Sequence, residues 1–178
     1  MSLKSISQLF LVGFLGFALV GCSSTPKNDS DDSKEVAVAQ VDTDIEAAKR
    51  AAAEQAAADL AAKKAELQAM INGKVIHFDF DRSEIRPSDY ELIKANADYL
   101  NLEQDASVTI KGYCDERGTR EYNLALGERR AQAVQNALVA EGVSPSRINV
   151  ISFGEDNPVD EGHNEAAWAK NRRAEFSY

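Results

Sequence analysis

Cysteine, histidine, tryptophan and proline are all scarce in this sequence, and their scarcity removes several kinds of site. The 178 residues include two cysteines, Cys22 and Cys114, two histidines, one tryptophan and four prolines. Neither His77 nor His163 lies at the spacing of a metal-ligand pair, and no Gly-x-Ser-x-Gly turn is present. A metal site that combines Cys114, Asp115 and a histidine is conceivable. The sequence nevertheless gives no positive sign of metal, cofactor or catalytic chemistry.

Long basic runs and long apolar runs are also missing. The net charge of −9, without any basic run, argues against binding to nucleic acid or to an anionic membrane surface by charge. The apolar stretch from Ile6 to Val20 is too short for a comfortable membrane span, which needs about 20 apolar residues. With Lys4 ahead of it, this stretch predicts an export signal over residues 1–21.

The export signal ends in Leu19-Val20-Gly21-Cys22, which resembles the lipobox recognised by lipoprotein signal peptidase. In such proteins the cysteine becomes the first residue and carries acyl chains, and several chains anchor a protein stably. The alternative is an ordinary secretory signal that happens to contain a cysteine. Ser23 rather than an aspartate follows Cys22, which resembles the default for outer-membrane sorting in enteric-type bacteria. Acylation of Cys22 leaves Cys114 without a partner for an internal disulfide.

Two segments of different composition follow the signal. Residues 22–43 are predicted to be a lipid-bearing disordered tether, because their stretch SSTPKNDSDDSKE is polar and acidic, with one proline and no aromatic residue. Residues 44–72 are mainly Ala, Glu, Lys, Gln and Leu, which predicts a helix capped at Asp44 and stopped at Asn72-Gly73. Large apolar residues are few in this helix. A solvated spacer is therefore favoured over a weak oligomerisation or partner helix.

Residues 73–178 predict one α+β domain, in which strands alternate with helices that pack on one sheet. Alternation in the first strand puts Ile76, Phe78 and Phe80 on one face. A long helix precedes Gly142. The other expected strands cover residues 107–111, 146–153 and 173–178, and the other expected helices cover residues 88–101 and 164–170.

One charged residue stands out on the long helix. At ~100° per residue, an arc of roughly 100° holds the apolar stripe. Its members are Leu126, Arg130, Ala133, Val134 and Ala137. Arg130 thus lies in the middle of the apolar face, where an unpaired guanidinium is costly. Its expected partner is an anion, either Asp115 in the preceding loop or the carboxylate of a ligand. A buried Arg–Asp strut that only pins helix to loop is as compatible with the spacing as a ligand site.

The stretch GYCDERGTREYNLALGERRAQAV resembles the signature of the OmpA-like peptidoglycan-binding domain. The resemblance extends from about Val75 to Tyr178 and includes DERGT, EYN, LGERRA and KNRRA. It implies an α+β fold with a mixed β-sheet and helices packed on it. The family's loop usually reads Gly-His-Thr/Ala-Asp. Here Gly112-Tyr113-Cys114-Asp115 keeps the aspartate and replaces the two residues before it.

The resemblance implies binding of meso-diaminopimelate, whose free end in peptidoglycan stems carries an ammonium beside a carboxylate. Asp115 and Arg130 fall on the positions that bind it in the family, and a fixed carboxylate near a fixed guanidinium suits such a zwitterion. The resemblance also makes Phe80 and Asp81 part of the pocket, largely through backbone groups. For Arg172-Arg173, a surface or sheet-edge charge pair and a ligand role both stay open. No metal and no cofactor are implied.

The lipid-anchored members of this family imply a location and partners. We expect a monomer on the periplasmic face of the outer membrane that holds the peptidoglycan without covalent bonds. The same domain surface is implied to engage the periplasmic propeller protein TolB, in the Tol system that constricts the envelope during division. Two other functions are weighed. One is a wall-anchoring lipoprotein without a Tol partner. The other is an envelope hydrolase with Asp115 and Glu116 as an acid/base pair, although the sequence gives no positive reason to expect an enzyme.

Overall fold

The computed structural model describes residues 33–178, with side chains from residue 43 onward. The predicted export signal, Cys22 and the first part of the predicted tether lie outside the described residues. Within the described range, no helix combines the length and the apolar character needed to cross a membrane. The chain divides into two units between Ala47 and Ala48, and the second unit, Ala48–Tyr178, is compact. The second unit contains all the strands that the structure describes.

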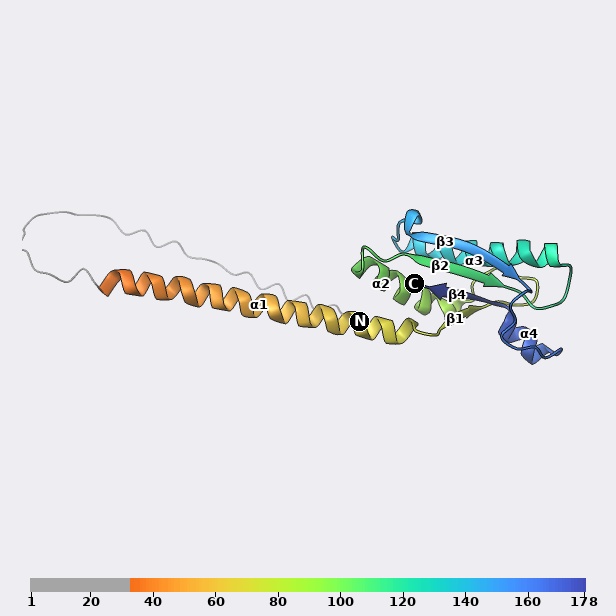
Figure 1. Cartoon of the computed structure of the whole chain (residues 1–178), viewed down its shortest axis with the longest axis horizontal. Helices are drawn as coiled ribbons and strands as arrows, with labels where there is room; N and C mark the ends of the chain where they lie inside the picture. Colours follow the sequence, from red (N-terminus) through yellow and green to blue (C-terminus); the bar gives the residue numbers. More distant parts are fainter. Residues whose placement is uncertain (1–32) are drawn as a thin grey trace, which may run out of the picture. The chain divides into compact units, whose positions relative to one another are not determined.

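Strands and helices alternate along this second unit, as the sequence predicts (Figure 1). Short 3-10 helices, η1 and η2, precede the second helix and the third strand. In chain order the elements are α1 (Ser33–Ile71), β1 (Val75–His77), η1 (Pro87–Asp89), α2 (Tyr90–Leu102), β2 (Val108–Tyr113), α3 (Arg120–Ala140), η2 (Pro145–Arg147), β3 (Ile148–Gly154), α4 (Glu165–Asn171) and β4 (Arg173–Ser177).

Helix α1 differs from its prediction at its start and agrees with it at its end. It begins at Ser33, so Asp44 is not its N-cap, and residues 33–43 of the predicted disordered tether are helical. These residues contain neither Gly nor Pro, and extending an existing helix is far less costly than nucleating one. The helix stops at Ile71 as predicted, where Gly73 has a φ of 66°.

The last turns of α1 are not wholly solvated, which differs from the favoured prediction of a solvated spacer. Leu67 and Ile71 are buried against Ala95 of α2, and Tyr99 packs at the side of this small cluster. The Gln68 side chain donates a hydrogen bond to the Tyr99 hydroxyl at 3.1 Å. The end of α1 is therefore part of the packing of the domain.

The sheet is mixed, as the predicted α+β class requires. Its strand order is β1-β4-β2-β3, with β2 and β3 parallel and β4 antiparallel to both of its neighbours. The parallel pair is joined through α3, the usual form of connection between parallel strands. Because β4 is the last strand and lies between β1 and β2, the sheet is completed only by the C-terminal residues.

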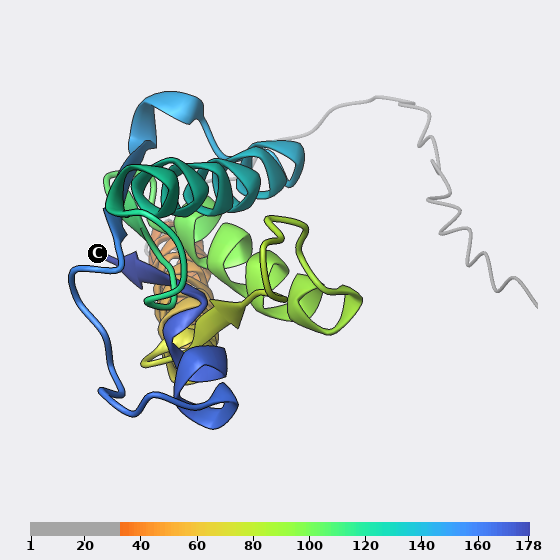
Figure 2. The same ribbon diagram turned by 90° about the vertical axis from the view of Figure 1, so that its right-hand side faces the viewer.

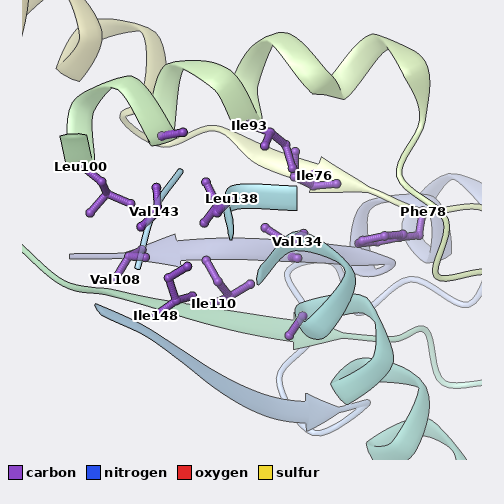
Figure 3. Close-up of a cluster of buried hydrophobic side chains, with 13 residues drawn as sticks. Ile76, Phe78, Ile93, Leu100, Val108, Ile110, Val134, Leu138, Val143 and Ile148 are labelled. Carbon is purple, nitrogen blue, oxygen red and sulfur yellow. The ribbon is translucent and has the colours of Figure 1, made fainter. Parts of the chain in front are cut away.

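A core of buried aliphatic side chains fills the space between the helices and the sheet (Figure 3). Ile93 and Leu100 come from α2, and Val134 and Leu138 come from α3. Strand residues complete the core, namely Ile76, Val108, Ile110, Ile148 and Ala174. The alternating positions Val108 and Ile110 of β2 are both buried in this core.

Helix α3 lies unusually close to β2, and two glycines permit this approach. A Cβ atom added at Gly112 would lie 1.9 Å from the carbonyl oxygen of Gly127, and one added at Gly127 would lie 2.4 Å from Ser152 Oγ. No side chain therefore separates helix from strand at this level. This contact brings Arg130, one turn after Gly127, to the end of β2.

Candidate functional site

The predicted site residues gather in one pocket at one end of the sheet. The pocket has a volume of about 190 Å³ and is lined by the loop after β1, the loop after β2 and the first half of α3. Figure 2 looks onto this end of the domain, with α3 at the top and α4 at the bottom. The lining includes all four predicted ligand residues, Phe80, Asp81, Asp115 and Arg130.

Arg130 is completely buried, as its place in the apolar stripe predicts, but its partners are not the predicted ones. Nε donates to the carbonyl oxygen of Arg82 at 2.8 Å, Nη1 to that of Tyr113 at 2.8 Å and Nη2 to that of Asp79 at 3.1 Å. Nη1 also contacts the Cys114 sulfur at 3.4 Å. The expected Arg130–Asp115 ion pair is absent among the described contacts, so the simple Arg–Asp strut is wrong.

Arg130 therefore keeps its positive charge with neutral partners. Burial lowers the pKa of its guanidinium, and the nearby carboxylates of Asp115 and Asp81 oppose this shift without pairing with it directly. The described contacts use four of its five N–H groups, one on Nε, two on Nη1 and one on Nη2. A guanidinium held in this way by backbone carbonyls is aimed at the pocket and can attract an anion.

Asp115 is held by two other arginines, which the sequence reading did not pair with it. Arg117 donates from Nε to Oδ1 at 3.2 Å and from Nη2 to Oδ2 at 2.7 Å, and Arg172 Nη1 reaches Oδ2 at 3.1 Å. Burial alone would raise the pKa of Asp115, but the hydrogen bonds from both arginines outweigh it and hold the pKa below its ordinary value. Asp115 is therefore a fixed carboxylate anion at neutral pH.

Arg172 and Arg173 are both buried, so they do not form the surface charge pair that the sequence left open. Arg172 Nη2 lies 2.7 Å from a carboxylate oxygen of Glu165 on α4, so Arg172 links Asp115 to α4. Arg172 also donates a hydrogen bond to the carbonyl oxygen of Phe78. Arg173 stacks over the ring of Tyr113 at 3.8 Å. Neither arginine lines the pocket, so their contacts support its walls from behind.

Phe80 does not share the buried face of Ile76 and Phe78, which corrects the alternation predicted for the first strand. Strand β1 ends at His77, and the Phe80 side chain is 56% exposed whereas Phe78 is fully buried. The backbone turns at Asp81, whose φ of 54° lies in the left-handed region that aspartate tolerates better than most residues. The turn moves the Phe80 ring out of the core and into the rim of the pocket.

The Phe80 ring forms one side of a cation–π stack. The Arg117 guanidinium carbon lies 4.0 Å from the centroid of the Phe80 ring and 4.1 Å from that of the Trp168 ring on α4. Arg117 also lies 3.5 Å from a carboxylate oxygen of Glu165. The sequence reading named neither Arg117 nor Trp168 as a site residue, and nothing local in the sequence indicates that the two meet.

The loop that carries Asp115 and Arg117 is fixed to the start of α3. Thr119 caps the helix by accepting a hydrogen bond from the Tyr122 backbone N–H at 3.2 Å. The Asn123 amide donates to the carbonyl oxygens of Asp115 and Arg117, each at 3.2 Å. On the opposite wall, the Tyr122 hydroxyl donates a hydrogen bond to Asp81. These contacts set the separation between the carboxylates of the pocket and Arg130.

Cys114 is buried beneath the pocket, directly after the end of β2. Its thiol donates to the carbonyl oxygen of Asn123 at 3.3 Å. Burial raises the pKa of the thiol to about 11 in spite of the nearby Arg130. Because the neutral thiol is a poor nucleophile, Cys114 is a packing residue at neutral pH.

The described residues contain no cluster of three or more His, Cys, Asp or Glu side chains that could hold a metal ion. His163, considered for such a site, instead contacts Glu116 at 2.7 Å on the surface. A larger cavity of about 420 Å³ lies by Gln68, Tyr99 and Tyr178, away from the predicted residues, and its lining contains no charged side chain. The pocket around Arg130 is therefore the better candidate for a charged ligand.

The chain belongs to the OmpA family, which is the class of protein that the fold and the pocket indicate. The family model matches residues 77–172, the stretch that contains β2, α3, β3 and every pocket residue. Within that family the most similar relatives include peptidoglycan-associated lipoproteins. The protein of that name from Pseudomonas aeruginosa is 46% identical over 100 residues, which cover 56% of this chain and 59% of the relative. The one from Haemophilus influenzae is 44% identical over 114 residues, which cover 64% of this chain and 73% of the relative.

A solved structure supports the same relationship. The crystal structure of the peptidoglycan-associated lipoprotein from Burkholderia pseudomallei matches with a TM-score of 0.60 and 41% identity, over 61% of this chain and 92% of that one. The resemblance drawn from the loop and helix motifs is thus confirmed. The relatives are named as lipoproteins and not as enzymes, which agrees with the expectation from sequence. The match spans about three fifths of the length of the Pseudomonas protein.

Proposed function

We propose that the protein is an outer-membrane lipoprotein whose domain binds peptidoglycan without covalent bonds, through the diaminopimelate of the stem peptide. The observation that carries this proposal is the state of Arg130. Its guanidinium is completely buried, its partners are neutral, and it lines a pocket whose other walls bear Asp81 and Asp115. A buried positive charge without a paired anion is costly, and a bound carboxylate removes that cost.

The chemistry of the diaminopimelate end group matches the distribution of charge in this pocket. Its carboxylate pairs with Arg130, and its ammonium finds a carboxylate in Asp115 or Asp81. Both charged groups of such a ligand leave water for partners held in place before binding, which makes charge-assisted hydrogen bonds most effective. Phe80, exposed at the rim, covers the apolar carbon chain between them.

Asp115→Ala tests this proposal in the unlipidated protein. Hydrogen bonds to charged groups contribute ~1.5–3 kcal/mol each, so binding to purified sacculi should weaken at least tenfold. The fold should survive, because Arg172 keeps Glu165 and the carbonyl oxygen of Phe78 as partners. The measurement is co-sedimentation with sacculi, with and without free diaminopimelate as competitor. Asp156→Ala is the matched control, since it removes an exposed carboxylate that pairs with Arg120 away from the pocket. Wild-type affinity in Asp115→Ala would contradict the proposal.

Anchoring to the outer membrane is proposed through Cys22, which precedes the tether and the helix that lead to the domain. Cys22→Ala should leave the protein unacylated. After digestion of the peptidoglycan, the wild-type protein is expected to float with outer-membrane vesicles and the variant to stay in the soluble fraction. A variant that still floats would show that this end of the chain is held by something other than lipid.

The resemblance to lipid-anchored members of the family supports a place in the Tol–Pal system, with TolB as periplasmic partner. The alternative is a wall-anchoring lipoprotein without a Tol partner. Retention of TolB from envelope extract on the immobilised protein separates the two. An envelope hydrolase is the least favoured function, because Glu116 is engaged by His163 and Trp168, and Asp115 by two arginines. Hydrolysis would release soluble muropeptides from sacculi.

A further inference from the structure

The carboxylate that should receive the ligand's ammonium is already occupied by a cation of the protein itself. Arg117 binds Asp115 side-on through Nε and Nη2, and it lines the pocket beside it. The guanidinium lies between the rings of Phe80 and Trp168, and Glu165 is a second carboxylate near it. Two aromatic faces and two carboxylates form a cage suited to a cation.

The two arginines on Asp115 are held very differently. Arg172 has three acceptors, in Asp115, Glu165 and the carbonyl oxygen of Phe78, and its side chain is 6% exposed. Arg117 belongs to the loop before α3, and its side chain is 30% exposed, so one side of its guanidinium faces solvent. The Arg117 side chain can therefore swing into solvent. Asp115 would still be paired with Arg172 and with the Arg117 backbone N–H at 3.1 Å.

We propose that Arg117 is an internal competitor for the ligand, which occupies the ammonium position on Asp115 in the free protein and is displaced on binding. This inference rests on the proposed function and adds a regulation of the same pocket. When a ligand with an ammonium binds, this ammonium replaces the Arg117 guanidinium on Asp115. The Asp115 carboxylate therefore has a cationic partner in the pocket both before and after binding. A dicarboxylate without an amine cannot make this exchange. The arginine thus favours amino-acid end groups over simple acids, at a cost in affinity.

Arg117→Gln tests the competition directly. Releasing the competitor should strengthen binding of meso-diaminopimelate to the unlipidated protein by about threefold or more, given the usual strengths of partly exposed ion pairs and cation–π contacts. Isothermal calorimetry measures the affinity. Binding of pimelate, which has the two carboxylates but no amine, should not strengthen. Arg120→Gln is the matched control, because it removes a neighbouring arginine paired with Asp156 outside the pocket, and it should bind as the wild type does.

The chain contains its own reporter of the displacement. Trp168 is the only tryptophan in the sequence; it stacks on Arg117 but does not line the pocket. Addition of meso-diaminopimelate should therefore change Trp168 fluorescence in the wild type along a saturation curve that matches calorimetry. In Arg117→Gln the ligand should bind without this change. Arg117→Lys, which keeps the charge but loses the planar stack, should have an affinity between those of the wild type and Arg117→Gln.

The outcomes separate this inference from the proposed function. Equal or weaker binding by Arg117→Gln would overturn the competition, and weaker binding would make Arg117 a direct ligand contact. Wild-type binding that leaves Trp168 fluorescence unchanged would overturn the displacement while leaving diaminopimelate recognition in place. Failure of the wild-type protein to bind diaminopimelate at all would overturn both.

Discussion

Arg130→Ala should lower the free energy of unfolding by about 3 kcal/mol or more and abolish binding to sacculi. The substitution leaves the buried carbonyl oxygen of Tyr113 and the partly buried carbonyl oxygens of Asp79 and Arg82 without their donor, and an unpaired buried group costs ~1–3 kcal/mol. It also removes the charge proposed to hold the ligand's carboxylate. Urea unfolding and co-sedimentation with sacculi measure the two effects.

The neighbouring residue supplies the control for this experiment. Arg129→Ala removes an exposed guanidinium that lies 5.7 Å from the centroid of the Tyr122 ring, and it should change neither property appreciably. Arg130→Lys separates the two roles, since an ammonium keeps the charge but cannot reach three carbonyls in different directions. We expect it to fold with reduced stability and to retain measurable binding. Normal stability and normal binding in Arg130→Ala would contradict the structure of the site.

Gly112→Ala is expected to be the most damaging substitution of a small residue, at about 3 kcal/mol of unfolding free energy. The added Cβ would lie 1.9 Å from the carbonyl oxygen of Gly127 and 2.7 Å from its carbonyl carbon, so α3 must move away from β2. That movement also carries Arg130 away from the pocket. Weaker wall binding should therefore persist in the folded fraction, at temperatures well below the melting transition.

A second glycine distinguishes this clash from the ordinary effects of adding a side chain. Gly73 has open space around it but a φ of 66°, so Gly73→Ala should cost only about 1 kcal/mol through backbone strain. It should leave wall binding unchanged. Equal destabilisation by the two substitutions, measured by urea unfolding, would show that the close approach of α3 and β2 relaxes easily.

The parts of the fold that local periodicity controls could be predicted from the sequence. The 3.6-residue repeat of α3 was enough to place Arg130 on the buried face, and the two-residue repeat of β2 agrees with the burial of Val108 and Ile110. The alternation of strands and helices gave the α+β class. The helix stop at Gly73 followed from glycine's tolerance of a positive φ.

The partners inside the pocket could not be predicted in the same way, because they depend on where distant segments meet. Arg172 reaches Asp115 across 57 residues of sequence. Two of the carbonyl oxygens that Arg130 bonds, those of Asp79 and Arg82, lie on either side of the turn at Asp81. The same turn places Phe80 outside the core, against the simple alternation of its strand. Backbone groups leave no mark in a sequence, so a reading based on side chains assigned Arg130 to the nearest carboxylate.

The start of α1 was missed for a different reason. Residues 33–43 look like a linker because they continue directly from the polar, acidic stretch SSTPKNDSDDSKE, which ends at Glu35. A helix already formed from residue 44 onward changes the balance, because each added residue gains a hydrogen bond without a new nucleation cost. The absence of Gly and Pro in this segment was the relevant signal.

The contact between the end of α1 and α2 determines how mechanical load would enter the domain. Under the proposed function, the protein is pulled between the membrane at one end of the chain and the wall at its pocket. Force transmitted along α1 first acts on the contacts between α1 and α2, namely the packing of Leu67 and Ile71 and the Lys64–Glu103 ion pair. Tension is thus diverted into α2 before it reaches β1, the strand that leads to Phe80 and Asp81. The pocket would be strained only after these contacts between α1 and α2 break. The attachment to the wall can therefore hold while the helix bears the load.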